Sequence, residues 1–208
     1  IVGPTAVGKT ALSLHLAKRF NGEIVSADSR LLYRGMAIGT AKPTPEEQQR
    51  VPHHLINVAA PDEVVGLAEF QAMAYAAIDE IHRRELLPFL VGGTGQYVRA
   101  VIEGWRVPRV PPNPRLRAEL EAEAERSGPA ALHTHLAVLD PVAAQGIHPH
   151  NVRRIIRALE VCLTTGEPFS RLRQKHPPPY RILQIGLTMD RQRLYARADQ
   201  RIAAMMAA

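Results

Sequence analysis

The sequence predicts an α/β fold in which a parallel-sheet core carries an inserted, all-helical domain. A glycine-rich loop beginning at Gly3 stands between two strand-like residues and a helix. Helical patterns then alternate with short apolar runs as far as Gly104, as they do in α/β proteins. Beyond Gly104, several helical patterns follow one another with no strand between them. We therefore expect residues 1–104 and 178–208 to form a P-loop-type α/β core, and residues 105–177 to form the insertion.

The elements of the core are predicted from apolar periodicity and turn residues. Apolar side chains recur at helical spacing after the first loop, and Asn21-Gly22 end that helix. Residues 23–27, 54–58 and 86–91 are candidate strands, and a long helix is expected over residues 67–84. Thr44 and Pro45 suit the cap and first turn of a short helix. A strand over residues 181–189 and a helix from residue 190 complete the core.

The insertion begins with a proline-rich stretch, residues 107–114, followed by helical patterns over residues 115–126, 129–139, 141–146 and 152–165. Charge separates the two halves of the chain. Residues 1–98 carry a net charge of −1, whereas residues 99–208 carry +7. A basic surface of this kind is typical of proteins that bind polyanions, although it also occurs on inert, solvated faces.

Composition restricts the class of protein. The chain is 46% hydrophobic and 22% charged, as folded globular proteins are, and it lacks an apolar run long enough for a membrane helix. Because Cys162 is the single cysteine, an intrachain disulfide is excluded, which favours a protein of a reducing compartment. The Cys162 side chain is expected to pack in the interior. We expect a soluble, cytoplasmic monomer. Because the first motif follows the first residue so closely, we also expect the chain to lack its beginning.

The first loop matches the phosphate-binding pattern G-x-x-x-x-G-K-[ST], in the strand-to-helix context that this pattern requires. Its backbone N–H groups and the positive end of the following helix favour a diphosphate, which Lys9 contacts at its terminal phosphate. The Thr10 hydroxyl is expected to bind Mg²⁺. The predicted phosphate-binding residues are Gly3, Pro4, Thr5, Ala6, Val7, Gly8, Lys9 and Thr10.

Asp28 follows the predicted strand 23–27. In a parallel sheet this strand end lies on the same side as the phosphate loop, so Asp28 is expected to face the phosphorylated substrate. A carboxylate in that place can take a proton from an incoming nucleophile. The alternatives are that Asp28 caps the turn or binds a water of the metal ion.

The chain resembles the tRNA dimethylallyltransferase family, also called tRNA isopentenyltransferases, over almost its whole length. The resemblance begins with the phosphate loop and continues through further motifs in the family's order. These motifs are residues 28–36, 38–43, 52–55, 91–97, 140–144, 147–149 and 153–160. One phosphate loop would be generic, but the ordered series is specific. Because members of the family continue well past the last residue here, the resemblance implies that the chain also lacks its end.

The resemblance implies a reaction. The family transfers a dimethylallyl group from dimethylallyl diphosphate to the exocyclic amine of the adenosine next to the anticodon in tRNA. Mg²⁺ is the implied cofactor. Asp28 matches the general base, Thr94 matches a contact to the target nucleotide, and Arg197 and Arg201 resemble arginines that neutralise the diphosphate.

The resemblance also implies contacts to tRNA, through the segment that touches the flipped adenine and through the helical insertion. The matching residues are Asp28, Ser29, Arg30, Leu31, Thr94, Arg117, Arg153, Arg154, Ile155, Ile156 and Arg157.

Two other enzymes remain as alternatives. A small-molecule P-loop kinase would bind ATP in the loop and use Asp28 on a substrate hydroxyl, but it does not require a basic insertion. An isoprenyltransferase acting on free adenine nucleotides would use the same core without a tRNA-binding surface.

Overall fold

The chain forms two compact units. The computed structural model describes residues 1–108, 110–172 and 174–207. The core unit comprises Ile1–Gly104 and Pro177–Ala208, and the helical unit comprises Trp105–His176.

A small parallel sheet organises the core unit. Its central strand β1 (Gly22–Ser26) lies between β2 (His53–His54) and β3 (Leu87–Val91), with Ile24 opposite His53 on one side and Phe89 on the other. Beyond these strands, Val2 forms one-residue parallel bridges to Gly92 and to Gly186. The α/β class with a parallel sheet is therefore confirmed.

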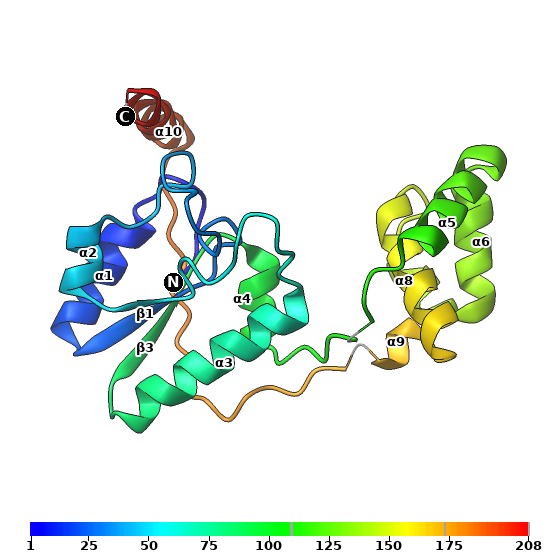
Figure 1. The fold of residues 1–208 in the computed structure, drawn as a ribbon, viewed down its shortest axis with the longest axis horizontal. Helices are drawn as coiled ribbons and strands as arrows, with labels where there is room; N and C mark the ends of the chain where they lie inside the picture. The colour runs from blue at the N-terminus through cyan, green and yellow to red at the C-terminus, as the bar shows by residue number, and fades with distance from the viewer. Residues whose placement is uncertain (109, 173, 208) are drawn as a thin grey trace. The chain divides into compact units, whose positions relative to one another are not determined.

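Two helices cover opposite faces of this sheet (Figure 1). Because side chains alternate along a strand, Val25 packs with Phe70 and Ala74 of α3 (Leu67–Arg83), as Ile24 packs with Ala17 of α1 (Lys9–Arg19). The same alternation places Ser26 and Asp28 on the α1 side. Both residues therefore face the phosphate loop, which leads into α1.

Local sequence explains where two helices of the core unit begin. Thr44 and Glu47 form a reciprocal capping box at the start of α2 (Pro45–Arg50). The helix α4 (Gly95–Ile102), which periodicity did not predict, follows β3 after residues 92–94. Asp190 caps α10 (Arg191–Met206) by accepting hydrogen bonds from the first backbone N–H groups.

The described residues of the helical unit contain helices and no named strand. The helices are α5 (Pro114–Ser127), α6 (Pro129–Leu139), α7 (Pro141–Gly146), α8 (Val152–Thr165) and α9 (Phe169–Leu172). Asn113, Asp140 and Asn151 cap three of them. Their apolar faces meet in a shared core that includes Leu132 and Leu159, both fully buried. The helix α9 was not predicted.

Two strand predictions need correction. Residues 181–189 do not form a strand, because their ladder is a single pair, Gly186 with Val2, and Leu183 is 83% exposed. The strand expected over residues 54–58 is instead the two-residue β2, which begins at His53. Among the described helices, none combines the length and the apolar composition that crossing a bilayer requires.

A buried carboxylate joins β1, β2 and the end of α3. The Glu23 side chain accepts two hydrogen bonds from Arg84, of 2.6 and 2.8 Å, and lies 2.6 Å from His54 Nε2. The hydrogen bonds from Arg84, opposed by burial and assisted by His54, lower the pKa of Glu23 from 4.5 to about 2. The ionised form therefore stabilises the fold above pH 4.5, and this stabilisation is lost as pH falls towards 2.

We expect Glu23→Gln to lower the melting temperature at pH 7 by roughly 5 °C and to flatten its decline between pH 4.5 and 2. Calorimetry across this pH range measures both effects. Glu85→Gln, which removes an exposed carboxyl after α3, is the control and should leave the curve unchanged. Parallel curves for wild type and Glu23→Gln would show that this carboxylate does not determine acid stability.

Candidate functional site

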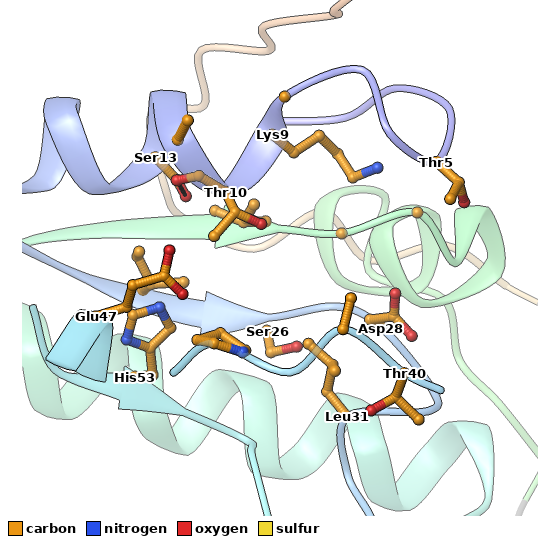
Figure 2. A pocket seen from close by; sticks show the side chains of 18 of the residues that line it. Thr5, Lys9, Thr10, Ser13, Ser26, Asp28, Leu31, Thr40, Glu47 and His53 are labelled. Carbon is orange, nitrogen blue, oxygen red and sulfur yellow. Dashed lines mark hydrogen bonds between the residues drawn. The ribbon is translucent and has the colours of Figure 1, made fainter. Parts of the chain in front are cut away.

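A cavity of about 370 Å³ lies in the core unit at the carboxyl end of β1. Ile24, Ser26 and Asp28 form one side of it, and the phosphate loop with the start of α1 forms the other. Figure 2 shows Lys9 and Thr10 on the α1 side, with Ser26 and Asp28 on the β1 side. The cavity therefore places a carboxylate opposite a candidate phosphate site.

The phosphate loop leaves the start of α1 open. Gly8 precedes this helix with φ of 106°, a left-handed conformation that favours glycine, and no side chain caps the helix. The first backbone N–H groups of α1 lack the partners that a cap would supply, and they carry the positive end of the helix dipole. An anion at this end of the cavity would accept hydrogen bonds from these N–H groups and would interact favourably with the positive end of the dipole.

Lys9 bends back over its own loop. Its Nζ donates hydrogen bonds to the carbonyl oxygens of Gly3 (2.9 Å) and Pro4 (2.8 Å). Burial lowers the pKa of Lys9, the Asp28 carboxylate opposes this effect, and Arg201 adds to it. The two loop carbonyls thus hold the ammonium group at the cavity wall.

Two arginines of α10 complete the positive side of the cavity. Arg197 and Arg201 are one helical turn apart, and both line it. A β-carbon on Gly8 would lie only 3.9 Å from Arg197 NH2, which places this guanidinium group over the phosphate loop. Among the described residues, neither arginine has a carboxylate partner. Their positive charge is therefore available to an anionic ligand.

Asp28 combines two of the roles that the sequence left open. Its Oδ1 accepts a hydrogen bond of 3.0 Å from the Arg30 backbone N–H, which caps the turn after β1. The same side chain lines the cavity, and its Oδ2 accepts no hydrogen bond from the described residues. One carboxylate oxygen thus positions the loop, whereas the other remains available to a substrate.

Thr94, which precedes α4, supports the Asp28 loop. Its hydroxyl oxygen accepts a hydrogen bond of 3.1 Å from the Ser29 backbone N–H, and its own backbone N–H donates to the Ala27 carbonyl. The sequence did not predict this contact, because it joins residues 65 positions apart.

The cavity brings together most of the predicted diphosphate residues. Of these it is lined by Thr5, Ala6, Gly8, Lys9, Thr10, Arg197 and Arg201, and it is also lined by Asp28 and Leu31, which were predicted to contact the acceptor adenine. Of the remaining predicted residues of the core unit, Val7 is buried, and Gly3 and Pro4 supply carbonyls to Lys9. Ser29, Arg30 and Thr94 belong to the adjoining loops.

Several lining residues had no predicted role in the site, among them Ser26 and His53. Ser26 Oγ is buried without a hydrogen-bond partner among the described residues. The alternation of side chains could have identified Ser26, because it stands two residues before Asp28 on the same strand face. Burial lowers the pKa of His53, a hydrogen bond with the Val51 carbonyl opposes this effect, and the side chain lies near Glu47.

The predicted RNA-contacting residues of the helical unit fall into two groups. Arg153 and Arg154 are exposed on α8, and Arg117 and Arg157 are partly exposed. Ile155 and Ile156, by contrast, are 0% and 5% exposed within the apolar core. Helical periodicity turns these two side chains inward, and the predicted RNA contact at these two positions stays a prediction.

Magnesium fits the polar groups of the cavity. Among the described residues, no three His, Cys, Asp or Glu side chains gather as a metal-binding cluster. Magnesium ions at phosphate sites are commonly held by few protein ligands together with phosphate oxygens. The Thr10 hydroxyl and the Asp28 carboxylate both line the cavity and suit this coordination.

The sequence is similar to one family over most of its length. The family model described as IPP transferase matches residues 31–208. A tRNA dimethylallyltransferase of Chloroflexus aggregans is 61% identical over 208 residues, covering 100% of this chain and 70% of the relative. One of Roseiflexus sp. is 60% identical, also over 100% of this chain, and covers 68% of that relative.

Solved structures show the same similarity. The full-length tRNA isopentenylpyrophosphate transferase of Bacillus halodurans is 50% identical with a TM-score of 0.65, covering 99% of this chain and 64% of that one. A eukaryotic dimethylallyltransferase acting on tRNA is 31% identical with a TM-score of 0.83, covering 99% of this chain and 52% of that one.

We expect Lys9→Ala to weaken the binding of inorganic diphosphate about 10- to 100-fold, because it removes charge-assisted hydrogen bonds. Titration calorimetry with inorganic diphosphate and Mg²⁺ measures the affinity. Lys18→Ala is the matched control, since it removes an exposed lysine from the same helix. If Lys9→Ala and Lys18→Ala bind diphosphate equally well, Lys9 is not a phosphate ligand.

Proposed function

The chain belongs to the IPP transferase family, and we propose that it transfers a dimethylallyl group from dimethylallyl diphosphate to tRNA. The acceptor is the exocyclic amine of the adenosine next to the anticodon. The observation that carries this proposal is the cavity, in which the Asp28 carboxylate lies opposite a phosphate loop and two cationic side chains of α10.

The donor binds through its diphosphate. The open N-terminus of α1, the Lys9 ammonium and the guanidinium groups of Arg197 and Arg201 provide hydrogen-bond donors and positive charge. Mg²⁺, when bound by the Thr10 hydroxyl and diphosphate oxygens, would neutralise part of the negative charge. These groups stabilise the diphosphate most strongly when its charge increases as it leaves.

The acceptor amine needs a base, because its lone pair is delocalised into the adenine ring. The available Oδ2 of Asp28 takes a proton from this amine while the nitrogen forms a bond to the allylic carbon. The bond between that carbon and the diphosphate oxygen breaks, and its electron pair leaves with the diphosphate. Thr94 holds the Asp28 loop in place through Ser29 during this exchange.

The helical unit supplies contacts to the tRNA backbone. Its sequence contains eleven Lys and Arg against seven Asp and Glu, a net charge of +4. Such side chains position a nucleic acid through its phosphates without reading its bases. The target adenosine must leave its base stack to reach a cavity of this kind, and phosphate contacts keep the tRNA bound while it does so.

A transfer assay tests the proposal. The full chain is incubated with Mg²⁺ and dimethylallyl diphosphate labelled in the prenyl group, with either tRNA or adenosine monophosphate as acceptor. We expect label in the tRNA at the adenosine next to the anticodon. Label in adenosine monophosphate alone would replace this function with prenylation of free nucleotides. Label in neither acceptor would refute both.

We expect Asp28→Ala to lower the single-turnover transfer rate about 10²- to 10⁴-fold, the usual contribution of a positioned base. Binding of both substrates should be retained, because other residues bind them. Asp62→Asn, which neutralises an exposed carboxylate of the core unit, is the control and should transfer at the wild-type rate. A near-normal rate in Asp28→Ala would restrict this residue to capping its turn.

A further inference from the structure

A buried carboxylate in the helical unit binds two of its arginines. Glu160 of α8 is 0% exposed, yet it is ionised, because hydrogen bonds outweigh the effect of burial on its pKa and bring it to about 2. Its Oε1 accepts hydrogen bonds from Arg117 Nε (2.8 Å) and the Asn113 backbone N–H (2.7 Å). Its Oε2 accepts from Arg117 NH2 (2.7 Å) and Arg157 NH1 (2.6 Å). Both oxygens are thus fully engaged.

These contacts fix the orientation of both guanidinium groups. Arg117 contacts Glu160 in a two-point fork, while Arg157 also donates from NH2 to the Val110 carbonyl, at 3.1 Å. The two side chains remain 37% and 33% exposed. A guanidinium group has five N–H donors, so both arginines retain donors for a further ligand.

Two more arginines stand beside this pair. Arg153 and Arg154 precede Arg157 by four and three residues, which places them one helical turn away on neighbouring positions of α8. Both are exposed, and among the described residues neither forms an ion pair. These four arginines and the one buried carboxylate together carry a net charge of +3, and two of the arginines contact the carboxylate directly.

We propose that Glu160 is a positioning residue for RNA binding, which holds Arg117 and Arg157 in a fixed fork that binds a phosphate of the tRNA backbone. This inference rests on the proposed function. A free arginine side chain loses rotamer freedom when it binds a phosphate, whereas these two have lost it on folding. The carboxylate thereby reduces the entropic cost of binding, although its charge is unfavourable for an anionic ligand.

Charge and positioning predict opposite effects when Glu160 is neutralised. Glu160→Gln keeps the shape of the side chain but removes its negative charge, which raises the net charge of the cluster by one. If Glu160 only stabilised the fold, the folded variant would bind RNA as well as wild type or more tightly. If it positions the two arginines, the folded variant binds RNA more weakly despite its greater positive charge.

We expect Glu160→Gln in the full chain to weaken the binding of tRNA about tenfold at physiological salt, the effect of restoring freedom to two arginine side chains. Filter binding over a series of salt concentrations measures it. Glu119→Gln is the matched control, because it removes an exposed carboxylate that pairs with Arg115 in the same unit. This control should bind as tightly as wild type or more tightly. Equal affinities for wild type and Glu160→Gln would overturn the proposal.

A second pair of variants keeps the test decisive if Glu160→Gln does not fold. Arg157→Lys retains the charge but loses the two-group contact with Glu160 and Val110, and it should weaken tRNA binding about threefold or more. Arg154→Lys makes the same change at an arginine whose side chain forms no ion pair with the described residues, and it should have a smaller effect. Equal effects of these two substitutions would also overturn the proposal. The comparison uses RNA binding alone, so a chain that binds tRNA but transfers no prenyl group would refute the proposed function and leave this inference standing.

Discussion

The site depends on the close approach of two strand ends, at Ala27 after β1 and Gly92 after β3. A β-carbon on Gly92 would overlap the Ala27 backbone, so this contact requires glycine. Hydrogen bonds from the Ala27 N–H to the Val91 carbonyl, and from the Thr94 N–H to the Ala27 carbonyl, hold the ends together. The Gly92 N–H donates to the Ile1 carbonyl, just before the phosphate loop. This contact thus helps to set the spacing between Asp28 and the phosphate loop.

Electrostatics follow from this arrangement. Lys9, Arg197 and Arg201 bring three positive charges to one cavity, and the lowered pKa of Lys9, caused first by burial, reflects the cost of holding an ammonium group there. The proposed diphosphate would relieve this cost, because it would replace the carbonyls of Gly3 and Pro4 as the partner of Lys9 and supply partners for the two arginines. The charges that line this cavity therefore favour an anionic ligand over an uncharged one.

Much of the core site could be predicted because it follows from local rules. The phosphate loop has a fixed pattern, and parallel strands end at one edge, which placed Asp28 beside it. Long-range contacts could not be predicted in this way. The resemblance identified Arg117 and Arg157 separately, but the sequence could not show that Glu160 binds both of them from two different helices. The prediction of a strand over residues 181–189 was wrong for a similar reason, because the apolar composition of a segment does not reveal whether another strand is present to pair with it.

Hydrogen bonding separates Asp28 from the buried carboxylates of the chain. Glu23, Asp140 and Glu160 each accept hydrogen bonds on both oxygens, so they are held in their ionised forms and serve structure. In the cavity itself, Glu47 uses one oxygen to cap α2. Asp28 has one oxygen bound to its own turn and the other available among the described residues, in a cavity that the phosphate loop also lines. A general base needs both a fixed position and a free lone pair, and among these carboxylates Asp28 combines them opposite the phosphate loop.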